Sequence, residues 1–84
     1  MAYGLIIDIG VTKTLGLMED ETTHDLFVLA MLDLRTNPHG RGQVVGSDGP
    51  HVRRAMALGV HGLIVYIVND ADSTVNVMDL IWTG

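Results

Sequence analysis

An uninterrupted apolar segment, Leu63 to Val68, places the strongest limit on how this chain folds. Most of its residues are β-branched, and the run lacks the alternation of a strand that has one face in water. Polar turns bound it, with Gly-Val-His-Gly at 59–62 before it and Asn69 to Ser73 after it. The pattern predicts a central strand covered on both faces.

Both flanking segments also have strand patterns. His51 to Leu58 alternates Val52, Arg54, Met56 and Leu58 with Arg53, Ala55 and Ala57, which is typical of a half-buried strand. Thr74 to Trp82 follows the second turn and is the last predicted strand. Tight connections between these segments predict three antiparallel strands in a meander.

The N-terminal half predicts a strand and two helices. Tyr3 to Ile9 is compatible with a strand, and residues 11, 15 and 18 are apolar at helical spacing, although Gly10 and Gly16 each cost about 1 kcal/mol relative to alanine. A longer helix is expected through Arg35. Thr22 and Asp25 resemble a capping box, the acids at 19–21 suit the helix dipole, and Asn-Pro at 37–38 ends the helix.

The longer helix is apolar nearly all the way round from Leu26 to Leu32, which is more than one sheet face requires. Either the sheet and the first helix bury it on all sides, or part of it contacts a partner. For the second alternative we assign Phe27, Leu29 and Met31 as partner-binding residues, with another protein or a second copy of the chain as the partner.

Residues 39–50 contain four glycines, the composition of a loop with at most a short extended stretch at 43–45. The chain has 84 residues and no cysteine, so one core must form by packing alone. We predict a single α+β domain over residues 1–84, ordered β-α-α-β-β-β, with an antiparallel sheet and both helices packed on one face. The apolar runs are far shorter than a membrane span, and the N-terminus does not resemble a secretory signal, so we expect a cytoplasmic protein.

The net charge of −5 disfavours strong binding to nucleic acid, but the charges are unevenly distributed. Between Arg35 and His61, four arginines face one aspartate, a net charge of +3. The rest of the chain holds Lys13 against nine carboxylates, a net charge of −8. We therefore expect the middle segment to meet any anionic partner.

Several local patterns accompany this order of elements. Met-Ala-Tyr opens the first strand, Asn-Pro-His-Gly at 37–40 ends the helix, and Gly-Pro-His-Val-Arg-Arg at 49–54 opens the next strand. The final hairpin combines Ile-Val-Tyr-Ile-Val-Asn-Asp at 64–70 with Thr-Val-Asn-Val-Met-Asp-Leu at 74–80. Together, over nearly the whole chain, these patterns resemble the RelE/ParE superfamily, the toxins of type II toxin-antitoxin systems.

The resemblance implies a protein that inhibits growth by acting on ribosome-bound messenger RNA, as an mRNA interferase, or on DNA gyrase, and that a cognate antitoxin neutralises. An acidic chain docks poorly on the polyanionic ribosome, which favours a protein target. The alternatives are a non-catalytic degenerate member of the superfamily and a dimerising protein-interaction domain. No cofactor is expected.

RNA cleavage needs groups that activate the 2′-hydroxyl, stabilise the phosphorane and protonate the leaving oxygen. The resemblance implies basic residues on the second and third strands and a His, Arg or Tyr near the C-terminus. Here Arg53 and Arg54 lie on the expected strand, and alternation lets only one face the cleft; Arg53 is the freer of the two. Gly62 stands where the family usually carries Arg, and Trp82-Thr83 replaces the usual His-Arg or His-Tyr.

Further candidates come from the basic middle segment. The turn residue His61 is a candidate acid or base, alongside Arg53 and Arg54 as catalytic residues, and a solvated turn histidine is the alternative. Candidate nucleic-acid contacts are Arg41, His51, Arg53 and Trp82, the last by stacking on a base or, alternatively, as a structural residue at the edge of the core. The histidines lack metal-ligand spacing, so no metal is expected.

One further motif competes with these readings. Leu-Ile-Ile-Asp-Ile-Gly-Val-Thr-Lys-Thr at 5–14 resembles the phosphate-binding opening of sugar kinases with the actin-like fold. That fold needs two large domains, which 84 residues cannot supply, and Val11 replaces the usual second glycine. We therefore interpret Gly10 as the turn into the first helix.

Overall fold

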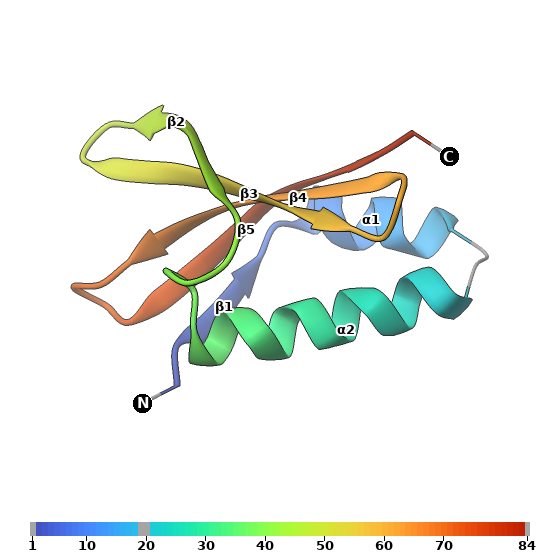
Figure 1. Ribbon diagram of the computed structural model, residues 1–84, viewed down its shortest axis with the longest axis horizontal. Coiled ribbons are helices and arrows are strands. Elements are labelled where there is room, and N and C mark those ends of the chain that lie inside the picture. Colours follow the sequence, from blue (N-terminus) through green and yellow to red (C-terminus); the bar gives the residue numbers. More distant parts are fainter. Residues whose placement is uncertain (1, 19–20, 84) are drawn as a thin grey trace.

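The computed structural model describes residues 2–18 and 21–83, which form two helices and one five-stranded sheet (Figure 1). Both helices lie on the same side of the sheet (Figure 1). The predicted α+β class is confirmed. The elements are β1 (Gly4–Ile7), α1 (Ile9–Leu17), α2 (Glu21–Thr36), β2 (Gln43–Asp48), β3 (His51–Leu58), β4 (Gly62–Asn69) and β5 (Thr74–Trp82).

The sheet has the order β1-β5-β4-β3-β2, so β4 is its central strand, as its apolar sequence predicts. Strands β3, β4 and β5 form the predicted antiparallel meander. Alternate residues of β4 point to the helices, where Ile64, Tyr66 and Val68 are buried. The opposite side of β4 is not covered to the same extent, because Leu63 keeps 38% of its surface exposed. Ile67 on that side is nevertheless buried, at 6% exposed, so the prediction of cover on both faces is correct for the helix side and only in part for the opposite side.

The sheet differs from the prediction at both edges. Residues 43–48, expected to be mostly loop, form β2 and pair antiparallel with β3, with a register shift between Val44 and Gly46. The ladder with β3 supplies the hydrogen bonds that the glycine-rich sequence alone does not indicate. At the other edge, β1 pairs with β5 in parallel, so the sheet is mixed rather than wholly antiparallel. Two helices separate β1 from the rest of the sheet in sequence, which leaves room for the crossover that a parallel pair requires.

The boundaries of the N-terminal elements follow from capping. Strand β1 ends at Ile7, two residues earlier than predicted, because Asp8 is the N-cap of α1 and its carboxylate accepts a hydrogen bond of 2.8 Å from the Gly10 amide. Helix α2 begins at Glu21, so Thr22 lies inside its first turn rather than at the predicted cap. Glu19 and Asp20, expected at this helix terminus, lie outside the described residues. His24 binds the Leu15 carbonyl at 2.9 Å and joins the two helices.

The core lies between the helices and the sheet. Helix α2 contributes one face, with Phe27, Ala30, Met31 and Leu34 buried, and α1 contributes Val11. These residues pack against β3, β4 and β5 in one apolar cluster. No helix in the described residues is long and apolar enough to cross a membrane.

Two leucines of α2 test this arrangement. Leu34 is fully buried, whereas Leu32 keeps 52% of its surface exposed. We expect Leu34→Ala to lower the free energy of unfolding by about 2–5 kcal/mol, because it removes apolar contacts and leaves a cavity. Leu32→Ala is the matched control, with an expected change within about 0.5 kcal/mol. Urea denaturation followed by circular dichroism measures both, and equal losses would contradict the assigned helix face.

Candidate functional site

A pocket at one end of the sheet brings together four titratable side chains. It has a volume of about 420 Å³ and lies between the loop that follows α2, the start of β3 and the β4–β5 turn. Its polar lining includes His39, His51, Arg54 and Asp70, and its apolar lining includes Val44, Pro50, Val52 and Val68. We call it the end pocket.

Two side chains of the sheet hold the loop that borders the end pocket. The Tyr66 hydroxyl is buried and donates to the Arg41 carbonyl at 2.8 Å. Arg54 donates to the same carbonyl through Nε at 3.2 Å and Nη2 at 3.0 Å, and through Nη2 to the His39 carbonyl at 3.1 Å. The loop then passes through Gly42 at a φ of 68°, where a Cβ would lie 2.6 Å from the Ala55 carbonyl oxygen. Only glycine fits this position without displacing its neighbours.

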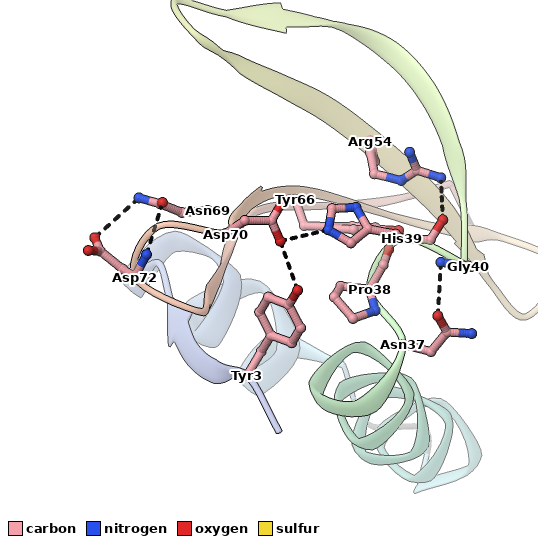
Figure 2. Close-up of polar contacts among 10 residues, drawn as sticks. All are labelled: Tyr3, Asn37, Pro38, His39, Gly40, Arg54, Tyr66, Asn69, Asp70 and Asp72. Atoms are coloured by element: carbon pink, nitrogen blue, oxygen red, sulfur yellow. Dashed lines mark hydrogen bonds and ion pairs between the residues drawn. The ribbon is translucent and has the colours of Figure 1, made fainter. Parts of the chain in front are cut away.

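Asp70 joins three distant parts of the chain at the rim of the end pocket. Its Oδ1 accepts a hydrogen bond of 2.8 Å from the Tyr3 hydroxyl and lies 2.8 Å from His39 Nε2 (Figure 2). Since a carboxylate accepts, Nε2 carries the proton and Nδ1 remains available to accept or to be protonated. Tyr3 and His39 also meet edge to face, with ring centroids 6.3 Å apart.

These contacts change the titration of the cluster. The hydrogen bond from His39, followed by that from Tyr3, holds the pKa of the Asp70 carboxyl below its usual value. The pKa of Tyr3 is raised by the same hydrogen bond to Asp70, by partial burial and by the negative charge of that carboxylate. Asp70 therefore stays ionised and orients His39 towards the pocket, as a carboxylate orients a histidine in many acid-base centres.

The predicted catalytic arginines point to opposite sides of the sheet, as strand alternation requires. Arg54 lies on the helix side beside Tyr66, and its guanidinium is engaged with the loop carbonyls. Arg53 lies on the other side, which we call the open face (Arg53, Leu63, Val65, Ile67 and Ile81). There it borders a depression of about 390 Å³ together with Met78 and Asp79.

His61 and Trp82, also predicted from the sequence, lie at the opposite end of β3 and β4. Their rings meet edge to face at a centroid distance of 5.9 Å, and the His61 carbonyl accepts from the Thr83 amide at 3.0 Å. A Cβ at Gly62 would lie 2.7 Å from the Leu58 carbonyl oxygen and 3.0 Å from the Trp82 ring. Glycine at this position is thus a packing requirement.

The structure therefore does not bring Arg53, Arg54 and His61 together. Of the candidate nucleic-acid contacts, only His51 lines the end pocket, while Arg53 is on the open face and Trp82 at the far end. Arg41 reaches Asp33 in an exposed ion pair of 3.8 Å. In the described part of the chain, no three acidic or histidine side chains are placed to hold a metal ion.

The partner-binding residues assigned to α2 divide between core and surface. Phe27 and Met31 are each 6% exposed, so the structure corrects their assignment: they face the sheet and cannot contact a partner. Leu29 is 59% exposed and lies beside Val28 and Leu32 on the outer side of the helix. These three residues form the surface that we call the α2 patch.

Sequence reasoning missed His39, Asp70 and Tyr3 as members of a site. His39 and Asp70 are 31 residues apart, and Tyr3 is 67 residues from Asp70, so no local spacing connects them. The one available signal was the pair of turns that hold them, Asn-Pro-His-Gly at 37–40 and Asn-Asp at 69–70. The sugar-kinase-like motif is also accounted for, because the Asp8 carboxylate occupies the N-terminus of α1.

Two solved structures share this fold along their whole length. A chain of the archaeal RelE–RelB complex from Pyrococcus horikoshii OT3 matches with a TM-score of 0.84 and 20% identity, covering 100% of this chain and 98% of that chain. A chain of the toxin-antitoxin complex RelBE2 from Mycobacterium tuberculosis matches with a TM-score of 0.74 and 13% identity, covering 99% and 100%. No family model matches the sequence, and the comparison with curated proteins gives no match. The chain has the RelE-like α+β fold, as the resemblance in sequence predicted.

The depressed pKa of Asp70 predicts a loss of stability in acid. Because the folded-state pKa is below the unfolded value of about 3.9, the contribution is complete above that value and is lost as the pH falls through the folded pKa. Tyr3→Phe removes one donor, so we expect the Asp70 pKa to rise and the acid-unfolding midpoint to move to higher pH. Carboxyl-carbon NMR titration measures the first and circular dichroism the second.

An Asp70→Asn background provides the control for this experiment. Without the carboxylate, Tyr3→Phe has no anionic partner to lose, and we expect it to leave the acid midpoint where it is. An equal shift in both backgrounds would show that Tyr3 acts through packing rather than through Asp70.

Proposed function

We propose that this chain is the toxin-like component of a type II toxin-antitoxin pair, held inactive by a cognate antitoxin. The observation that carries the proposal is the full-length match to a chain of the RelE–RelB complex, at a TM-score of 0.84. The match includes both helices and the whole sheet, so it does not arise from one shared hairpin. The second neighbour, also from a toxin-antitoxin complex, supports the same assignment.

The positions of the basic residues favour action by binding rather than by cutting RNA. Acid-base chemistry on a phosphodiester needs its groups within hydrogen-bond reach of one reacting centre. Arg53 lies on the open face, Arg54 holds the loop on the other side, and His61 packs on Trp82 at the far end. With a net charge of −5, the chain also gains little from the polyanionic ribosome. A protein target, of which DNA gyrase is the example that the resemblance offers, fits these features better than ribosome-bound mRNA.

The α2 patch supplies a surface for a protein contact. Val28, Leu29 and Leu32 are 57%, 59% and 52% exposed and lie within two turns of one helix. Adjacent exposed aliphatic residues of this kind mark interaction surfaces more often than isolated ones do. A second copy of the chain is the alternative occupant of this patch, as expected for a dimerising interaction domain.

Tightly induced expression in a bacterial host tests the proposal. We expect the natural chain to arrest growth, and Leu29→Asp to relieve the arrest by placing a charge in the α2 patch. Leu17→Asp is the matched control, because Leu17 is an exposed helical leucine on α1, 84% exposed and outside the patch, and it should remain toxic. Thermal unfolding of the purified variants verifies that both are folded.

The outcomes separate the alternatives. Unaffected growth with the natural chain would contradict the toxin assignment and favour a degenerate or dimerising domain, which sedimentation of the natural chain and of Leu29→Asp would then distinguish. Arrest that survives Leu29→Asp but is abolished by Arg53→Ala would place the activity on the open face instead.

A further inference from the structure

We propose that the end pocket binds a nucleotide, with the phosphate held by Arg54 and His51 and the base lying on the apolar wall. The inference rests on the geometry of the pocket and does not depend on the toxin assignment. It concerns the helix side of the sheet, away from Arg53 and the open face.

The size and composition of the end pocket are those of a small-molecule site. Its volume of about 420 Å³ lies within the range of roughly 300–1,000 Å³ that is typical of small-molecule sites. Sites of this kind combine apolar walls with a few polar groups that fix the orientation of the ligand. Here Val44, Val52 and Val68 come from three adjacent strands and form a wall beside the polar groups. A flat ring suits this wall.

The end pocket also offers hydrogen-bond donors for a phosphate. Arg54 uses Nε and Nη2 to hold the loop, and none of its described hydrogen bonds involves Nη1, which points away from the loop in Figure 2. A guanidinium anchored through two of its nitrogens presents the third at a fixed position, with little conformational entropy left to lose on binding. His51 lines the same pocket and is half-buried, and the N–H of its ring adds a second donor.

The aspartate at the rim does not oppose an anion in the way that a free carboxylate would. Asp70 already accepts hydrogen bonds from Tyr3 and His39, so its charge is partly compensated within the cluster. Its role is to position the His39 ring, whose backbone carbonyl is in turn held by Arg54 at 3.1 Å.

Titration with adenosine 5′-monophosphate, followed by amide and imidazole NMR signals, tests the site. We expect saturable shifts at His39, His51 and Arg54, with weaker binding of adenosine and of inorganic phosphate, since each lacks half of the ligand. His51→Gln should weaken binding about tenfold, the effect of losing one charge-assisted hydrogen bond. His61→Gln is the matched control, because it removes an imidazole at the other end of the sheet, and it should leave the affinity unchanged.

A second variant protects the test against misfolding. Val52 is 48% exposed, so we expect Val52→Asp to fold, and the added negative charge on the pocket wall should abolish binding of the phosphate. The absence of saturable binding by the natural chain, or binding that neither His51→Gln nor Val52→Asp reduces, would overturn the proposal. A parallel titration with an adenylyl dinucleotide separates the two sources of this ligand: tighter binding than the mononucleotide identifies a nucleotide within an RNA chain, and weaker binding identifies a free nucleotide.

Discussion

The backbone carbonyl of Arg41 anchors the loop that follows α2 and leads into the edge strand β2. It accepts hydrogen bonds from the Tyr66 hydroxyl and from two nitrogens of Arg54, side chains that stand next to each other on β4 and β3. The loop after α2 is thereby held against the helix side of the sheet and turns through Gly42 into β2. The edge strand, the wall of the end pocket and the position of His39 all follow from this anchor.

Helix α2 and strands β3 and β4 could be predicted from the sequence because their patterns are local. The apolar run in β4, the alternation in β3 and the proline after α2 each specify an element without reference to the rest of the chain. Strand β2 could not be predicted in this way, because its sequence is that of a loop and its ladder depends on the anchored loop and on β3. The parallel pairing of β1 with β5 joins segments about 70 residues apart, and no local signal reports it.

In the candidate sites, too, features set by the local sequence could be predicted, whereas features that depend on the folded chain could not. Alternation correctly predicted that Arg53 and Arg54 face opposite sides, yet it could not show that Arg54 is engaged with three loop carbonyls. On α2, an apolar sequence does not distinguish buried Phe27 from exposed Leu29 until the sheet is in place. The cluster of Tyr3, His39 and Asp70 depends on three connections that meet only in the folded chain (Figure 2). What results is a RelE-like fold whose basic residues are dispersed and whose polar cluster lies at one end.

We propose that this chain acts through binding, without a centre that cuts RNA. Primer extension on abundant transcripts, sampled minutes after induced expression, measures this most directly. We predict arrested growth with no new cleavage ends in the transcripts, because Arg53, Arg54 and His61 do not share one reacting centre. New cleavage ends that require translating ribosomes would contradict it and would show that the chain is a ribosome-dependent endoribonuclease.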